Sequence, residues 1–174
     1  MSSLTPTFGD EIDGRAFWLT LGQRPIGMTV VTSDSDDGPT GFLGLSAAHV
    51  TANPPTMLVS VDRKTSALAG ILSRRHFAVN FLPATAVKIA DAFGGKSGLS
   101  GAARFTAGEW CSLATGAPVF RDALGVFDCV VDDVLERGDV SIIIGKVVAV
   151  AASAGEEPLI FFRGKSYSGL RQVK

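Results

Sequence analysis

The chain has 174 residues, 46% of them hydrophobic, and its 16 lysine and arginine residues nearly balance 17 aspartate and glutamate residues. This length favours a single domain over residues 1–174, and the apolar content is sufficient for a hydrophobic core. The formal net charge of −1 and the lack of a basic stripe argue against a nucleic-acid partner. The apolar runs are too short for a membrane helix and the N-terminus lacks a signal-peptide pattern, so we expect a cytoplasmic protein without a membrane partner.

In chain order, the sequence predicts short helices among many strands. Residues 1–12 are expected to be flexible or loosely packed. A helix follows over residues 13–24, where Asp13 can cap the first turn and Phe17, Trp18 and Leu21 share one face. The segments with β-type composition are 27–33, 56–62, 76–82, 124–136, 140–152 and 158–170, and residues 34–41 are expected to form a turn that leads into a further strand.

Two further helices are expected between these strands. One covers residues 65–75, with Thr65 or Ser66 as its N-cap, and the other covers residues 84–93, where two glycines follow. Residues 94–118 are rich in glycine and alanine and are expected to be partly irregular. Short turns between strands imply antiparallel pairing, and six or more strands can lose their exposed edges by closing into a barrel. The expected fold class is therefore mainly β, an antiparallel barrel with flanking helices.

The cysteine and histidine residues give no sign of a metal site. Cys111 and Cys129 form no close-spaced motif and are expected to be buried thiols, not a disulfide. His49 and His76 lie far apart in the sequence, with no carboxylate or thiol at the spacing of a metal site. We therefore expect no bound metal.

An abrupt polar stretch, Asp62–Ser66, joins the strand at 56–62 to the helix that follows. A helix N-terminus presents free backbone N–H groups, Thr65 and Ser66 add hydroxyls, and Arg63 and Lys64 add positive charge. These features together favour a site for an anion, most naturally a phosphate. The alternative from these residues alone is a simple helix cap with two solvated cationic side chains.

The segment GPTGFLGLSAAHVTANPPTMLVSVDRKTS, residues 38–66, resembles the signature of the flavin reductase-like family, the FMN-binding split barrels. The positions in step with the family pattern are Gly41, Ser46, Asn53, Pro54, Pro55, Val61, Asp62, Arg63 and Ser66. Likeness in the expected order extends from roughly residue 15 to residue 168. The resemblance implies a six-stranded split β-barrel that forms a homodimer with FMN or FAD beside the dimer interface.

The same resemblance implies where the ligands lie. The flavin phosphate is expected on Asp62, Arg63, Lys64, Thr65 and Ser66, and the ring along Leu43, Gly44, Leu45 and Ser46, with Phe93 as a cover. NADH or NADPH is expected to stack on the ring near Arg24, Pro25, Val140 and Tyr167. Typical members reduce diffusible flavin for a partner monooxygenase. Hydride transfer between cofactors needs no catalytic side chain, which agrees with the lack of an acid–base pair or nucleophile motif.

Two departures from the family pattern keep alternatives open. Leu43 and Leu45 stand where many relatives have Thr and Asn, so two side-chain hydrogen bonds to the flavin are missing. Val140 replaces the usual His of a Gly-Asp-His sequence. One alternative is a flavin-binding protein without nicotinamide use, acting as a carrier, a sensor or a reductase of another acceptor. The other is an interaction module whose pocket is filled by the two leucines.

Overall fold

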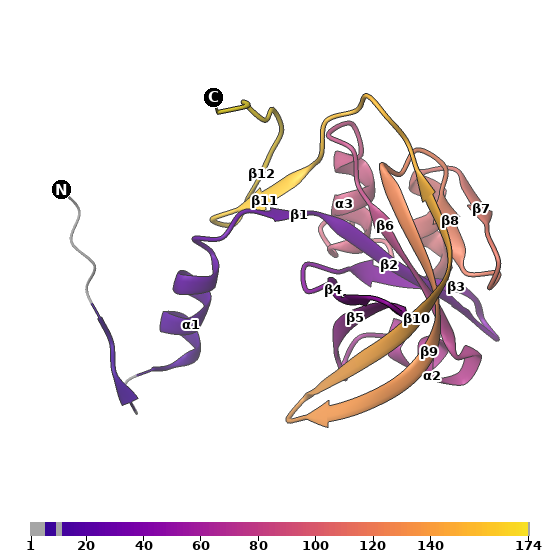
Figure 1. Cartoon of the computed structure of the whole chain (residues 1–174), viewed down its shortest axis with the longest axis horizontal. Coiled ribbons are helices and arrows are strands. Elements are labelled where there is room, and N and C mark those ends of the chain that lie inside the picture. Colours follow the sequence, from indigo (N-terminus) through magenta and orange to yellow (C-terminus); the bar gives the residue numbers. More distant parts are fainter. Residues whose placement is uncertain (1–5, 10–11, 174) are drawn as a thin grey trace.

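The computed structural model describes residues 6–9 and 12–173, and its main element within these ranges is an antiparallel sheet of seven strands (Figure 1). The strands are β2 (Thr29–Ser35), β3 (Gly38–Leu43), β4 (Ala48–Ala52), β5 (Pro55–Asp62), β6 (His76–Phe81), β9 (Gly125–Arg137) and β10 (Val140–Ala152). Their order in the sheet is β3-β2-β6-β9-β10-β5-β4. The predicted mainly-β antiparallel architecture is confirmed.

The sheet differs from the predicted barrel in two details. It has seven strands in the described chain instead of six, and its two edge strands, β3 and β4, do not pair with each other there. β4 is a strand that was not predicted, and four of its five residues are exposed. Its sequence AHVTA does alternate apolar and polar residues, but the run is only five residues long. The segment predicted as a strand at 158–170 lies outside this sheet and forms the short strands β11 (Ile160–Phe162) and β12 (Lys165–Tyr167).

The remaining elements surround this sheet. The helices are α1 (Gly14–Leu21), α2 (Ala67–Arg74), α3 (Val87–Phe93) and the 3-10 helix η2 (Gly101–Ala107). β1 (Ile26–Gly27), β11 (Ile160–Phe162) and β12 (Lys165–Tyr167) form a small sheet, and β7 (Trp110–Ser112) pairs with β8 (Pro118–Phe120). Figure 1 shows α1 standing apart from the main sheet and reaching it through β1. Asp13 caps α1 as predicted, because its Oδ1 accepts a hydrogen bond of 2.7 Å from Ala16 N.

The main sheet is covered on both faces. Neighbouring residues Val30 and Val31 of β2 belong to different buried clusters, and so do Ala78 and Val79 of β6. This follows from the pleat of a strand, which points successive side chains to opposite faces. One cluster lies under α3, η2, β7 and β8, and the other lies under α2. Two buried faces explain why these strands read as nearly continuous apolar runs.

Buried polar side chains attach the segment from α3 to β8 to the sheet. Asn80 of β6 donates to Val30 O at 3.1 Å and accepts from Phe120 N at 2.9 Å. Asp128 of β9, which is fully buried, accepts from the backbone N–H of Thr115 at 2.8 Å and from its hydroxyl at 2.5 Å. These hydrogen bonds satisfy polar groups inside the core. They also hold in place the segment from α3 to β8, whose sequence predicts little regular structure.

Other expectations concern the termini and the thiols. Part of the predicted flexible segment, residues 1–5 and 10–11, lies outside the described residues, while Phe8 and Ile12 are exposed. Cys111 and Cys129 are both free thiols; Cys129 is buried as expected, whereas Cys111 is only half-buried. In the described ranges, none of the helices is both long and apolar enough to span a bilayer.

Candidate functional site

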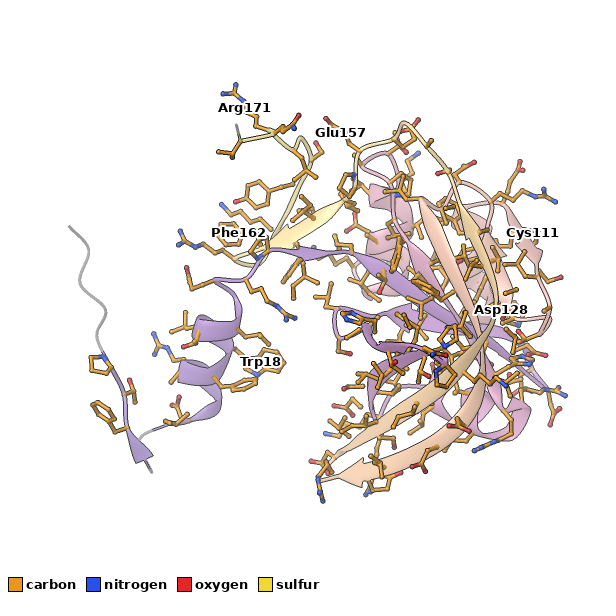
Figure 2. The ribbon with its side chains drawn as sticks, viewed as in Figure 1. Trp18, Cys111, Asp128, Glu157, Phe162 and Arg171 are labelled. Atoms are coloured by element: carbon orange, nitrogen blue, oxygen red, sulfur yellow. The ribbon has the colours of Figure 1, made fainter. Side chains whose placement is uncertain are left out.

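A groove of about 880 Å³ separates α1 from the main sheet. Its apolar walls come from α1, β1, the loop after β3, and β11; these side chains are Trp18, Leu19, Leu21, Ile26, Leu43, Leu45 and Phe161. In Figure 2 the Trp18 side chain points from α1 toward the sheet. The groove therefore joins residues that are far apart in the sequence.

The loop after β3 is fixed tightly against β2. Gly44 N donates to Thr29 O at 2.8 Å, and the Thr29 hydroxyl donates back to Gly44 O. A Cβ atom at Gly44 would lie 2.6 Å from Val31 Cγ2, so only glycine permits this approach. Leu43 and Leu45 on either side are half-buried, packing against the core and lining the groove at once. A rigid apolar surface of this kind suits a flat aromatic ligand.

Ser46 connects this loop to β5. Its hydroxyl donates to Ser60 O at 3.0 Å and accepts from Ser60 N at 3.2 Å. Ser60 lies two residues before Asp62, where the predicted anion stretch begins. β5 therefore runs from the groove to that stretch, and one extended ligand would be able to contact both.

The polar rim of the groove is cationic. Arg15, Arg24 and Arg163 line it, and no carboxylate is among the described residues that do. Arg163 is held in place by Gln23, whose Oε1 accepts from Arg163 Nε at 2.9 Å and from Nη2 at 2.5 Å. An apolar groove with a positive rim is suited to an aromatic ligand that carries negative charge.

The predicted anion stretch forms a tight turn before α2. Asp62 Oδ1 accepts from Lys64 N, and Asp62 O accepts from Thr65 N, both at 2.8 Å. Ser66 occupies the N-cap of α2, and its hydroxyl makes no capping hydrogen bond within the described chain. The Arg63 guanidinium, in contrast, is paired with Glu136 at 2.6 Å. Lys64 and Ser66 are therefore the members of the stretch best placed to bind an anion.

The residues predicted to bind the nicotinamide do not lie together. Arg24 lines the groove, whereas Val140 begins β10 and pairs in register with Asp62. Tyr167 shares one face of the small sheet with Phe162, its edge-to-face neighbour, because it pairs in register with Ile160. The groove-lining Phe161 occupies the opposite face of β11.

Pro25 precedes β1 and is exposed, and it is not among the described residues that line the groove. The predicted site residues thus form two groups, one in the groove and one around Asp62, joined by β5. Pro25 and Tyr167 stand outside both.

Phe93 does not lie over the groove, contrary to its predicted role as a cover for the flavin ring. It is 3% exposed and packs against Phe105 and Trp110, with ring centroids 5.0 and 5.5 Å away. A Cβ atom at Gly41 would lie 2.9 Å from Phe93 Cε1, so the ring presses on the inner side of β3. Its position at a helix end resembled that of a ligand contact, but the ring completes an aromatic cluster in the core.

Several residues of the site were not predicted from the sequence. Trp18 was identified as part of an amphipathic helix face, but that face was not linked to a ligand. Gln23, Glu136 and Phe161 carried no signal, because their importance depends on partners that are distant in the sequence. Of these features, only the aromatic face of α1 was visible in the sequence, and a ligand contact could have been predicted from it.

The described chain brings no metal-binding cluster together, and it buries one of its two thiols. Among residues 6–9 and 12–173, no three His, Cys, Asp or Glu side chains come close enough to hold a metal ion. Burial, and then the nearby Asp128 charge, raise the pKa of the Cys129 thiol to about 12. The Cys129 thiol is therefore protonated at neutral pH and unreactive.

Comparison with known proteins relates the chain to one group. The family model described as "Flavin reductase like domain" matches residues 21–170. The chain is 37% identical over 135 residues to the FMN reductase (NADH) RutF of Agrobacterium fabrum, covering 78% of this chain and 76% of that protein.

Solved structures agree with this relation. The flavin reductase PheA2 matches with a TM-score of 0.83 and 28% identity, over 92% of this chain and 100% of that chain. BorF, the flavin reductase component of a bacterial two-component tryptophan halogenase, matches with a TM-score of 0.83 and 25% identity. That match covers 92% of this chain and 100% of the BorF chain.

Proposed function

The chain belongs to the flavin reductase-like family, and we propose that it is an NADH-dependent reductase of FMN that releases the reduced flavin to a second protein. The observation that carries this proposal is the groove beside the loop after β3, with its fixed apolar surface and cationic rim. The relative from Agrobacterium fabrum is named for the same pair, FMN and NADH. FAD and NADPH are the second choices for the two substrates.

The residues present fit a flavin. Leu43 and Leu45 offer a flat apolar surface, and the backbone of the same loop is held by Gly44 and Ser46. When bound, the flavin supplies the hydride chemistry, accepting from NADH the two electrons that it later carries away. The task of this chain is to hold the two reactants in contact and to exclude water from between them. No side chain has to exchange a proton for that step, so we assign no catalytic residue.

We place the flavin phosphate at the turn between β5 and α2. Lys64 would supply the positive charge, and Ser66 and the first N–H groups of α2 would supply hydrogen bonds. Asp62 and Thr65 would shape the turn through the hydrogen bonds described above. The link from Ser46 to Ser60 supports one ligand that spans the groove and this turn.

We propose that the protein works as a homodimer. α1 exposes Phe17, Trp18 and Leu19 by 54%, 67% and 60%, and none of its residues is buried against the described chain. Apolar surface gathered on one helix is typical of an interface. A second copy on this face would cover the aromatic side chains and close the groove. Light scattering that gives a stable monomer able to bind flavin would contradict this part of the proposal.

The partner proposed to use the reduced flavin is a flavin-dependent monooxygenase. BorF is the reductase component of a two-component system, which supports a similar division of labour here. We place both proteins in the cytoplasm, where NADH is available and where free thiols such as Cys111 and Cys129 stay reduced.

The decisive experiment follows NADH absorbance with the purified chain and added FMN. We expect NADH to be consumed only when FMN is present, with reduced flavin as the product under anaerobic conditions. NADPH and FAD, tested in the same way, define the preferred pair. A protein that binds FMN but consumes neither nucleotide would instead support a flavin carrier or sensor.

A further inference from the structure

Arg63 contacts both sides of the tip of the β9-β10 hairpin. Its Nη2 and Nε atoms donate to Glu136 Oε2 at 2.6 and 3.0 Å. Its backbone N–H donates to the Asp139 carbonyl at 2.9 Å. Glu136 lies near the end of β9, and Asp139 lies in the turn before β10. The side chain and the main chain of Arg63 therefore hold the hairpin at two separate points.

Glu136 is itself held by a second donor. The Ser141 hydroxyl on β10 donates to Glu136 Oε1 at 3.0 Å and to Oε2 at 3.2 Å, and the two residues pair in register. The hydrogen bond from Arg63, and then the one from Ser141, lower the pKa of the Glu136 carboxyl. The hydrogen bond to Glu136, and then the Glu136 charge, raise the pKa of the Arg63 guanidinium. Both groups are charged at neutral pH, so the contact is an ion pair.

This ion pair sits beside Val140. Val140 is the first residue of β10, and it pairs in register with Asp62 on one side and Arg137 on the other. Arg63 therefore contacts the hairpin next to Val140, at the point where the hairpin meets the turn after β5. The pairing of β10 with β5 begins at Val140, and the hairpin tip before it projects beyond the body of the sheet (Figure 1).

The same geometry bears on phosphate binding. Two of the three guanidinium nitrogens of Arg63 are occupied by Glu136, whose negative charge also offsets the positive charge that a phosphate would meet there. Lys64, the next residue, is exposed and makes no salt bridge with any other described residue. Lys64 can therefore approach an anion without breaking an existing ion pair.

We propose that Arg63 is a positioning residue that fixes the hairpin tip, with Val140, against the turn after β5, and that Lys64 alone supplies the cationic contact to phosphate. The pair is half exposed, at 51% for Arg63 and 49% for Glu136, so its effect is on local order more than on global stability. The effect that we expect on the KM for NADH rests on the proposed function. The effect that we expect on the order of the hairpin does not.

The first test measures hydrogen exchange of the backbone amides over residues 136–141 in the flavin-free protein. Arg63→Gln and Glu136→Gln should each speed exchange there by about two- to fivefold, the range expected for a half-exposed ion pair. The reversed pair, Arg63→Glu with Glu136→Arg, should restore slow exchange. Arg137→Gln, a neighbouring exposed arginine outside the pair, serves as the matched control. Unchanged exchange in both single variants would overturn the proposal.

The second test separates positioning from phosphate binding by titrating FMN and riboflavin, which lacks the phosphate. Arg63→Gln should change the affinities for both flavins alike, keeping their ratio within about twofold. A loss for FMN of tenfold or more beyond the loss for riboflavin would identify Arg63 as a phosphate ligand and refute the proposal.

The third test uses steady-state kinetics with NADH. Arg63→Gln and Glu136→Gln should raise KM for NADH by about two- to fivefold and leave kcat within about twofold, and the reversed pair should recover KM. A fall in kcat without a change in KM would refute the link to Val140. If the wild-type protein oxidises no NADH, the proposed function fails, while hydrogen exchange and the flavin titrations still decide the role of Arg63.

Discussion

The main sheet and helix α1 place their aromatic residues in opposite environments. Phe77 of β6 is fully buried in the cluster under α2, whereas Trp18 of α1 is 67% exposed (Figure 2). The sheet is covered on both faces by other parts of the same chain. No residue of α1 is fully buried against the described chain.

This difference shows how the groove is built. Its floor, the loop after β3, belongs to the sheet and is fixed by hydrogen bonds to β2 and β5. Its opposite wall, α1, is held only by its connection to β1 and by neighbours such as Arg163, whose backbone N–H donates to Gly22 O at 3.3 Å. One side of the site is thus built by a single chain, and the other side is the exposed helix on which we propose that a second copy binds.

The largest expected effect concerns the stability of the sheet. Phe77→Ala should lower the free energy of unfolding by about 3–5 kcal/mol, because it removes a fully buried ring. Trp18→Ala should change it by no more than about 0.5 kcal/mol when the protein is dilute enough to be monomeric. Urea denaturation of the two variants makes the comparison. A large loss for Trp18→Ala in the monomer would mean that α1 packs on its own chain.

The second prediction tests the face of α1 directly. Trp18→Ser should weaken homodimer association by about 30-fold or more, as expected for an aromatic residue at the centre of an interface. Flavin affinity should fall with it, because Trp18 also lines the groove. Analytical ultracentrifugation and flavin titration measure the two effects. Val173→Ser, which changes another exposed apolar residue, should leave both unchanged.

The third prediction addresses the turn that lies beyond the groove. Lys64→Glu should weaken FMN binding by about tenfold or more relative to riboflavin, because it replaces an attraction to phosphate with a repulsion. Lys88→Glu, on the surface of α3, provides a control with the same change in net charge. Equal losses for FMN and riboflavin would show that the phosphate lies elsewhere.

The fourth prediction concerns Val140, which can pack against a nicotinamide but cannot form a hydrogen bond with its carboxamide. Val140→His should raise kcat/KM for NADH by up to about tenfold, equivalent to about 1.4 kcal/mol of transition-state stabilisation. FMN affinity should change little, since the groove floor is untouched. Steady-state kinetics with both nucleotides provide the measurement. A variant with unchanged kcat/KM would place the nicotinamide away from the hairpin.

The smallest expected effect comes from the buried thiol. Because the pKa of Cys129 is raised to about 12 in the folded protein, the unfolded chain loses this proton first as the pH rises. Stability should therefore fall above about pH 8.5, by less than about 1 kcal/mol at pH 9. Urea denaturation between pH 7 and pH 9 tests this. The free energy of unfolding of the Cys129→Ala variant should not show this decrease with pH. In the native state, a thiol reagent should modify Cys111 well before Cys129.

Much of the sheet was predictable because its strands have uninterrupted apolar runs and clear turns. The segment from residue 94 to residue 118 was only partly predictable. η2 and β7 within it depend on polar contacts such as Trp110 Nε1 to Phe105 O, at 2.9 Å, and Thr115 to Asp128. Contacts of this kind leave no periodic pattern in a sequence.

The candidate site combines features that the sequence displays with features that it does not. The order of motifs led to the predicted ring contact at 43–46 and the predicted phosphate contact at 62–66, and the structure links these two segments through Ser46 and Ser60. The pairing of Arg63 with Glu136 joins residues 73 positions apart, so the composition of the turn alone suggested a phosphate ligand instead. Phe93 shows the reverse case, since its place in the core depends on Phe105 and Trp110 from later in the chain.

The strand order of the main sheet has a consequence for protein synthesis. β3, β2 and β6 form one half of the sheet and β5 with β4 forms the other, and the β9-β10 hairpin between them is made last. Until β9 and β10 leave the ribosome, no strand pairing joins the two halves, and Thr115 has no Asp128 to bind. A nascent chain that lacks β9 and β10 therefore carries two groups of strands without the hairpin that joins them, and the sheet becomes continuous only after residue 152 has been made.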